Sequence, residues 1–386
     1  MELDDKMRTL RAASRERAMF FRAQALALDA DPDTVPRNLN RDDVDVVRRL
    51  MIPAAHNPAP LRIGSYVYEG YHCLDNVVGL CELAWGDPGF VLACPGTSLS
   101  GLVVAELGDE EQKERFFAEV LAEYQWTFFA VTEPGRGSDA LQMSTELRSD
   151  GADGHTLHGA KRYIGNGARG SRGVVFARTG KHPLSIRGVL VEAPDPGFRA
   201  ETLDMVGLRG AAISELTFDG VPIPPERLLG RHLPTSRRGF MGAMHVFNHM
   251  RPHVAAMAVG IAQAVHDYTT AQITRPDAWL RAEFDQTGAR IEAVRRLVYR
   301  AAAALDADSS DGRLGSVAKL EAVRLAAALT RRGPELLGRA SLLEHPLLEK
   351  WQRDVTACEI MEGTSNIQRL AVAAGHAKGE VAGHAR

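Results

Sequence analysis

The sequence of 386 residues contains no long apolar run, and its first residues are charged. A membrane-spanning helix needs about 20 consecutive apolar residues, and a secretory signal needs a short apolar core near the N-terminus. The chain has neither. We therefore expect no membrane span, no membrane partner and a cytoplasmic location.

Cysteine is scarce as well, because only Cys73, Cys81, Cys94 and Cys358 occur. These residues form neither a CxxC pair nor the ligand spacing of a zinc site. Buried free thiols in a reducing compartment are the simplest interpretation. We expect no metal site.

An excess of one charge is also missing. The chain carries 46 Lys and Arg against 49 Asp and Glu, a net charge of −3, and its arginines are spread along its length. Nucleic acid is therefore not expected as a partner. Hydrophobic residues at 45% and charged residues at 25% are typical of a globular protein of two or three domains.

What is present divides the chain into three parts. Residues 1–124 repeat apolar residues at helical intervals, and residues 233–386 are alanine-rich and helical again. Residues 125–232 contain short β-branched and aromatic segments separated by Gly, Pro and Asp, which is typical of a β domain. The pattern predicts an α+β multidomain protein with its β domain in the middle.

Three segments could carry chemistry. In the first, residues 128–140, Gly135 and Gly137 would allow close approach of backbone amides to a ligand, with Thr132 and Ser138 adding hydroxyls. Such a loop suits a polar ring edge or a phosphate. The alternative is a plain hairpin connection.

The second segment, residues 159–167, places Tyr163 beside Gly165 and Asn166. The aromatic ring could form a wall for a flat cofactor, or it could pack in the core of the β domain.

The third segment, residues 359–373, contains Glu362 followed by Gly363, Thr364 and Ser365. The glycine could let the carboxylate project into a cleft, and the two hydroxyl residues could cap the following helix. Alternatively, the glutamate serves only the helix dipole.

Together these segments resemble the acyl-CoA dehydrogenase family in order and spacing, from about Asp43 to Ala374. The matching motifs are VTEPGRGSD, KRYIGNG, GLRGAAISELTFDGVPIPPERLLG, MRPHVAAMAVGIAQA and RDVTACEIMEGTSNIQRL. In the last and most specific motif, Arg353-Asp354 stands at the family's distance from Glu362.

The resemblance implies an N-terminal helical domain, a middle β-barrel domain and a C-terminal four-helix bundle, with FAD between the last two. It also implies three sets of functional residues. The cofactor-binding set is Phe129, Val131, Thr132, Ser138, Tyr163, Gly165, Thr364 and Asn366. The substrate-binding set is Ser138, Arg251 and Gly363. Glu362 is the catalytic base.

The implied reaction is the α,β-dehydrogenation of an acyl thioester. Glu362 would take the α-proton while the β-hydrogen leaves as hydride to flavin N5. The Glu362 backbone N–H would bind the thioester carbonyl as negative charge develops on it. Burial in an apolar cleft should raise the pKa of Glu362 towards the working pH.

The sequence departs from the family at several positions. Tyr163 stands where tryptophan is usual, Gly165 where threonine is usual, and Asn248 where an acidic residue near the coenzyme A adenine is usual. The Arg-x-x-Phe-Gly segment, which reaches FAD across a subunit interface, has no clear counterpart, and Gln-x-x-Gly-Gly is reduced to residues 334–338.

These departures leave the substrate and partners open. The acyl carrier could be coenzyme A or an acyl carrier protein, which four basic residues could meet: Arg169, Arg172, Lys181 and Arg187. The electron acceptor could be an electron-transfer flavoprotein or oxygen, and a homodimer or homotetramer is implied. Tyr68, Tyr71 and Cys94 could line the acyl pocket, although core packing explains each of them as well.

Three alternative functions stay open on the same scaffold. They are an acyl-CoA oxidase, a flavin monooxygenase and an FAD-free, non-catalytic relative.

Overall fold

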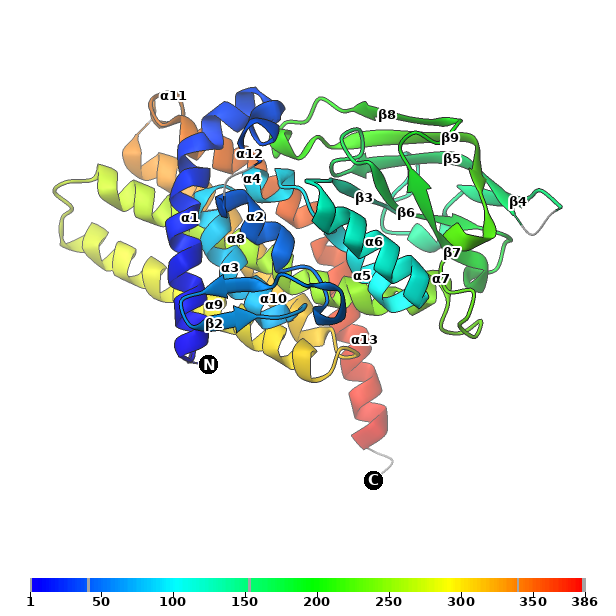
Figure 1. Cartoon of the computed structure of the whole chain (residues 1–386). Helices are drawn as coiled ribbons and strands as arrows, with labels where there is room; N and C mark the ends of the chain where they lie inside the picture. Colours follow the sequence, from blue (N-terminus) through cyan, green and yellow to red (C-terminus); the bar gives the residue numbers. More distant parts are fainter. Residues whose placement is uncertain (1, 40–41, 152–153, 339, 384–386) are drawn as a thin grey trace.

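A computed structural model of the chain describes residues 2–39, 42–151, 154–338 and 340–383. Helices dominate its N-terminal part (Figure 1). They are α1 (Asp5–Ala30), α2 (Asp42–Arg49), α3 (Cys73–Gly86), α4 (Pro88–Ala93), α5 (Ser98–Leu107) and α6 (Glu110–Ala122). A capping box starts α6, because Asp109 and Gln112 each accept the other's backbone N–H, at 2.9 and 3.0 Å.

A small hairpin interrupts these helices. Strands β1 (Leu61–Ile63) and β2 (Tyr66–Tyr68) pair antiparallel just after a segment that contains Pro53, Pro58 and Pro60. Each strand has only three residues, which is too short for alternation to be recognised in the sequence.

The middle part is one seven-stranded sheet. Its strands are β3 (Thr127–Ala130), β4 (Glu146–Ser149), β5 (His155–Ile164), β6 (Arg172–Arg178), β7 (Ile186–Glu192), β8 (Phe198–Thr202) and β9 (Ser214–Ile223). The order is β3-β6-β4-β5-β9-β8, and β7 pairs with β6. In the described residues β8 pairs only with β9, so the expected barrel is an open half-barrel.

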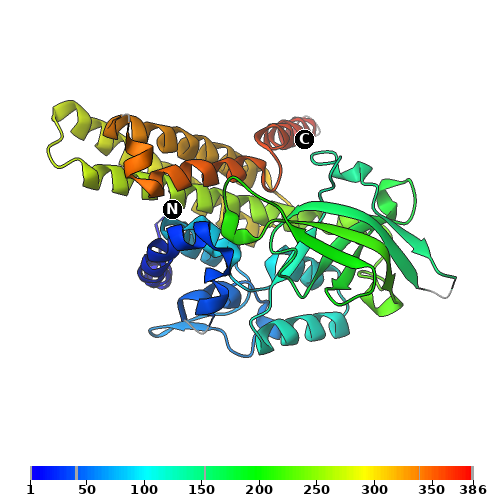
Figure 2. The same ribbon diagram turned by 90° about the horizontal axis from the view of Figure 1, so that it is seen from above.

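The C-terminal part is the expected helical bundle. It consists of α7 (Gly239–Gly242), α8 (Met244–Gln272), α9 (Ala278–Ala307), α10 (Arg313–Leu337), α11 (Ser341–Glu344), α12 (Pro346–Ile360) and α13 (Ser365–Gly383). Helices α8, α9, α10 and α12 pack together, and α3 lies against α8 and α9. In Figures 1 and 2, α13 leaves the bundle and extends away from the body.

The two helical parts share one hydrophobic core. Side chains from both, such as Phe21 on α1, Val77 on α3, Ile261 on α8 and Trp351 on α12, are fully buried in it. The sheet lies to one side of the helices (Figure 2). The predicted domain limits, 124/125 and 232/233, fall in the connections from α6 to β3 and from β9 to α7.

A buried ionic cluster joins all three parts at α12. Lys350 Nζ pairs with Asp87 Oδ2 and Asp354 Oδ2, at 2.5 Å each, and all three side chains are at most 1% exposed. Asp354 Oδ1 also accepts the backbone N–H of Leu208, at 2.7 Å, from the loop before β9. The cluster fixes the helix that leads to Glu362.

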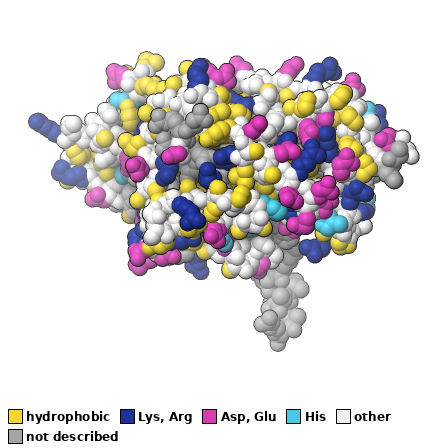
Figure 3. Space-filling model, in the orientation of Figure 1, with side chains coloured by type: hydrophobic (Ala, Val, Ile, Leu, Met, Phe, Trp, Pro, Cys, Tyr) yellow, Lys and Arg dark blue, Asp and Glu magenta, His cyan; other side chains and the backbone are white. Residues whose placement is uncertain are grey.

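The surface shows no division into areas of one charge on the face drawn in Figure 3, where acidic and basic side chains lie interspersed. None of the helices in the described ranges is long and apolar enough to cross a membrane.

Candidate active site

Glu362 lies in the short connection between α12 and α13, where the backbone is left-handed. Its φ is 54° and that of Gly363 is 91°. Such an angle costs an ordinary L-residue roughly 1–2 kcal/mol, so other contacts must hold the turn. Gln368 Nε2 donates to the carbonyls of Glu362 and Gly363, at 2.9 Å each. Lys319 Nζ donates to the carbonyls of Met361 and Gly363.

The carboxylate of Glu362 is the chemically unusual group of this turn. Its Oε2 atom is buried and has no hydrogen-bond partner among the described residues. Burial raises the pKa of Glu362 to about 7, although the nearby charges of Lys319 and Arg251 act in the opposite direction. A carboxyl with this pKa is partly ionised at neutral pH, which suits a general base.

Arg251 on α8 lies near Glu362 and beside a pocket of about 510 Å³. Its Nη1 donates to Asn248 Oδ1 at 3.1 Å and to Ser316 Oγ at 3.2 Å. The pocket is bordered by α8, the α9–α10 connection and α13, with lining residues Asn248, Arg251, Asp308, Ser310, Asp311, Gly312, Arg313, Ala371, Ala374 and Gly375. A pocket of this size can admit part of a large organic ligand.

The segment that ends β3 faces the same helix. Phe129 packs edge-on against Phe247 of α8, with ring centroids 5.9 Å apart, and Val131 belongs to the same hydrophobic cluster. Phe247 and Arg251 are four residues apart and therefore lie on one face of α8. This helix thus connects the predicted cofactor segment with the Glu362 region.

Thr132 and Tyr163 come from neighbouring backbone segments, because the Arg162 N–H donates to the Thr132 carbonyl at 2.9 Å. Tyr163 sits at an irregularity in the β5–β9 pairing, with φ of 63°, and is 56% exposed. Its ring is not packed in the core, the alternative left open by the sequence. A side chain at Gly165 would meet no atom within 4 Å of its Cβ, so open space adjoins this residue.

A buried ion pair that the sequence analysis missed anchors this loop. Glu133 accepts from Ser144, Thr145 and Lys161, and Lys161 Nζ also donates to the Val131 carbonyl at 2.8 Å. Burial works against the carboxylate, but Lys161 and these hydrogen bonds lower the pKa of Glu133 to about 2. The sequence signal for this ion pair was Glu133 inside the VTEPG motif. Its partner, Lys161, is 28 residues further along the chain.

The remaining predicted residues are less constrained. Ser138 lies in an exposed loop, and the exposed Asn366 accepts from Arg369 at 2.9 Å. Thr364 is half-buried, and its carbonyl accepts the Gln368 N–H inside α13. Ser365 does not act as the expected cap, because its hydroxyl donates to Glu359 Oε2 at 2.5 Å.

Three of the four basic residues that could meet a carrier protein are engaged within the molecule. Arg169 donates to the carbonyls of Pro32 and Gly210, Arg172 pairs with Glu119, and Arg187 is buried against the Leu229 carbonyl. Each of these cations is engaged within the molecule. Of the four residues, only Lys181 is exposed and makes no side-chain contact in the described part.

Two of the proposed pocket-lining residues have core roles. Tyr68 is 1% exposed and donates to the Lys6 carbonyl at 2.7 Å, and Cys94 is 7% exposed and contacts the Phe90 carbonyl. Tyr71 is different, because its hydroxyl is buried without a partner in the described residues while its ring stacks on His253.

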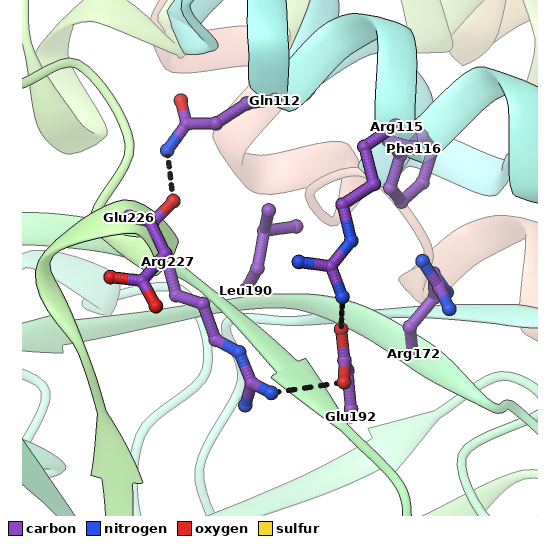
Figure 4. A pocket seen from close by; sticks show the side chains of 8 residues that line it. All are labelled: Gln112, Arg115, Phe116, Arg172, Leu190, Glu192, Glu226 and Arg227. Carbon is purple, nitrogen blue, oxygen red and sulfur yellow. Dashed lines mark hydrogen bonds and ion pairs between the residues drawn. The ribbon is translucent and has the colours of Figure 1, made fainter.

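A second, smaller pocket lies where α6 meets the sheet (Figure 4). Its volume is about 30 Å³, enough for roughly one water. Arg115 and Arg227 both pair with Glu192 across it, and the Gln112 amide donates to the Glu226 carbonyl. We interpret this pocket as part of the polar contact between α6 and the sheet.

Comparison with known proteins agrees with this geometry. Residues 128–221 match the acyl-CoA dehydrogenase middle-domain model, and residues 237–376 match the C-terminal-domain model. The mitochondrial short-chain specific acyl-CoA dehydrogenase of Bos taurus is 34% identical over 286 residues, 71% of this chain and 68% of that protein.

Solved structures share the fold at lower identity. Butyryl-CoA dehydrogenase from Megasphaera elsdenii superposes with a TM-score of 0.81 at 23% identity, over 97% of this chain and 99% of that one. The prolyl acyl carrier protein oxidase AnaB has a TM-score of 0.79 at 20% identity, over 96% and 99%.

The fold and the site define an oxidoreductase of the acyl-CoA dehydrogenase type. The chain belongs to the acyl-CoA dehydrogenase family, as its motifs predict.

Proposed function

We propose that this protein dehydrogenates an acyl thioester between Cα and Cβ, with Glu362 as the base. The observation that carries the proposal is the buried Oε2 atom of Glu362, which has no hydrogen-bond partner among the described residues and is held in a left-handed turn within the family's most specific motif. A simple helix-dipole role would not require the carboxylate to be buried or the backbone to be left-handed.

The residues present fit FAD as the cofactor. Tyr163 presents an exposed aromatic ring, open space adjoins Gly165, and the Thr132 segment lies beside them. Phe129 and Val131 pack beneath this segment, Ser138 lies in the exposed loop that follows it, and Thr364 and Asn366 would hold FAD from the start of α13. When bound, FAD would supply the electron pair acceptor for the hydride that leaves Cβ.

The chain's own residues would accept the α-proton of the substrate. Glu362 must be ionised to accept the α-proton, and a pKa of about 7 leaves both forms populated at neutral pH. The backbone N–H of Glu362 would bind the thioester carbonyl, where negative charge develops. Arg251 and Gly363 border the same turn and would contact the substrate.

Two observations bear on whether coenzyme A or an acyl carrier protein carries the acyl group. Asn248 lines the 510 Å³ pocket where an acidic residue is usual, which favours a departure from ordinary coenzyme A binding. Against this, three of the four basic residues suggested for a carrier protein are engaged internally. We therefore propose an acyl thioester on either carrier, with an electron-transfer flavoprotein or oxygen as the acceptor.

The test is anaerobic reduction of the bound flavin by a panel of acyl-CoA and acyl-carrier-protein thioesters. Bleaching of the flavin absorbance by at least one member is the expected result. Purified protein without flavin would instead favour a non-catalytic relative. Flavin that is bound but reduced only by a nicotinamide, followed by oxygen transfer, would favour a monooxygenase.

A further inference from the structure

A buried lysine on α10 lies beside the turn that carries Glu362. Lys319 is 2% exposed, and its Nζ donates to the carbonyls of Met361 and Gly363, one on each side of Glu362. In the described contacts it bonds no carboxylate directly. Burial lowers the pKa of Lys319 to about 8, although the Glu362 charge acts to raise it.

These hydrogen bonds fix the orientation of a peptide plane. In a trans peptide the C=O of one residue and the N–H of the next point in opposite directions. Drawing the Met361 carbonyl towards Lys319 therefore turns the Glu362 N–H away from the lysine. Gln368 restrains the following plane in the same way, through the Glu362 carbonyl at 2.9 Å.

We propose that Lys319 is a positioning residue for the base Glu362. It holds the Met361–Gly363 backbone so that the Glu362 N–H and carboxylate are presented together, and it places a positive charge beside the carboxylate. The inference rests on the proposed function, because it assigns Lys319 a role in the reaction of Glu362.

Charges on three helices act on this pair. Arg251 on α8 and Lys319 on α10 both lower the pKa of Glu362. Cys358 and Glu359 on α12 act to raise the pKa of Lys319. Removing the Lys319 charge leaves only Arg251 to oppose the effect of burial. The pKa of Glu362 should then rise further above about 7, and less base would be available at neutral pH.

The experiment compares Lys319→Met, Lys319→Gln and Lys319→Arg with the wild-type holoenzyme. The rate of anaerobic flavin reduction by an acyl thioester is measured against pH. Lys319→Met should lower the rate at pH 7 by about 10–100-fold, since small misplacements of reacting groups have effects of this size. Its half-maximal rate should lie at higher pH than in the wild type.

The other two variants separate charge from hydrogen bonding. Lys319→Gln keeps a donor but no charge, so it should share the upward pH shift, whereas Lys319→Arg keeps the charge and should shift little. Arg324→Met is the matched control, because Arg324 lies on the same helix but its side chain is 75% exposed. It should leave both the rate and the pH midpoint unchanged.

A second measurement does not depend on turnover. The infrared band of the protonated Glu362 carboxyl, identified by its loss in Glu362→Gln, is followed through a pH titration of each variant. A higher midpoint in Lys319→Met and Lys319→Gln supports the proposal. Folded variants with wild-type midpoints and rates would overturn it. If none of the thioesters tested reduces the flavin of the wild type, the proposed function fails. The titration still decides whether Lys319 affects the pKa of Glu362.

Discussion

At the scale of single residues, Glu362 shows how backbone geometry determines the surroundings of a carboxylate. Gly363 after it has φ of 91°, and a Cβ there would lie 2.9 Å from Gln368 Nε2, which disfavours any larger residue. The turn keeps Glu362 Oε2 buried, and no residue in the described part of the chain forms a hydrogen bond with it. The sequence alone allowed a helix-dipole role for this residue, and the structure gives the physical reason to prefer a base.

The pKa of Glu362 makes a prediction about stability. An unfolded glutamate ionises near its ordinary value of 4.5, but in the folded protein the pKa is about 7. Between these values the unfolded state loses its proton first, so rising pH destabilises the folded wild type at this position. Glu362→Gln removes that effect.

The difference in thermal midpoint, Glu362→Gln minus wild type, should therefore grow from pH 5 to pH 8. Calorimetry at both pH values measures it. A difference that stays constant or shrinks would show that the folded carboxyl is not shifted upward.

A second residue-scale prediction concerns Gly165, where the family usually has threonine. Because a Cβ at this position meets no atom within 4 Å, Gly165→Thr should change the free energy of unfolding by no more than about 0.5 kcal/mol. If the missing hydroxyl favours oxygen as the acceptor, the same change should slow reoxidation of the reduced flavin by oxygen, measured by stopped-flow.

Gly167→Thr is the contrasting variant. A Cβ there would lie 2.8 Å from the Cβ of Ser214, so this change should destabilise the protein by about 1–3 kcal/mol. Equal destabilisation by both substitutions would contradict the open space at Gly165.

At the scale of elements, α12 is the helix on which the site depends. Arg353 pairs with Asp29 on α1 at 2.6 Å, and Asp354 joins Lys350 and the Leu208 N–H. These contacts explain why an Arg-Asp pair precedes Glu362: it attaches α12 to the first helix and to the sheet before the turn begins.

Lys350→Met should therefore be strongly destabilising. It leaves Asp87 and Asp354 buried without their cation, and breaking a buried ion pair costs about 3–5 kcal/mol. Chemical denaturation measures the loss. Lys113→Met, which breaks an exposed pair with Glu110, should cost under about 1 kcal/mol, and similar losses in both would argue against the buried cluster.

The elements also show what the sequence could predict. The β domain between two helical parts was predicted, because helical apolar periodicity and β-branched segments separated by turn residues are local signals. Strands β4 and β8 are short and carry exposed charged residues, so no such local pattern marks them. The partners Glu133–Lys161 and Lys319–Met361 were missed because they are 28 and 42 residues apart and no local pattern connects them.

At the scale of the whole molecule, two large apolar side chains are exposed on the helical bundle. Trp279 at the start of α9 is 63% exposed and Leu343 on α11 is 89% exposed. Both elements lie at the end of the bundle away from the sheet (Figures 1 and 2). Large exposed apolar side chains of this kind are typical of interfaces, and we propose a homodimer or homotetramer assembled through them.

Trp279→Lys should weaken that assembly. Sedimentation velocity is expected to show a shift towards monomer at micromolar concentration. Leu184→Lys is the control, because Leu184 is 37% exposed in the connection between β6 and β7, in the sheet part of the molecule, and should leave the distribution unchanged. A monomeric wild type would contradict the proposal.

The most direct test of the central claim is anaerobic flavin reduction by an acyl thioester carrying deuterium at Cα. The wild type should bleach its flavin, and deuterium should slow the reaction if Glu362 removes that proton in the rate-limiting step. Glu362→Gln should retain FAD but reduce it at least about 100-fold more slowly, the lower end of the range of effects for a lost general base. Rapid bleaching in Glu362→Gln would show that another group removes the proton.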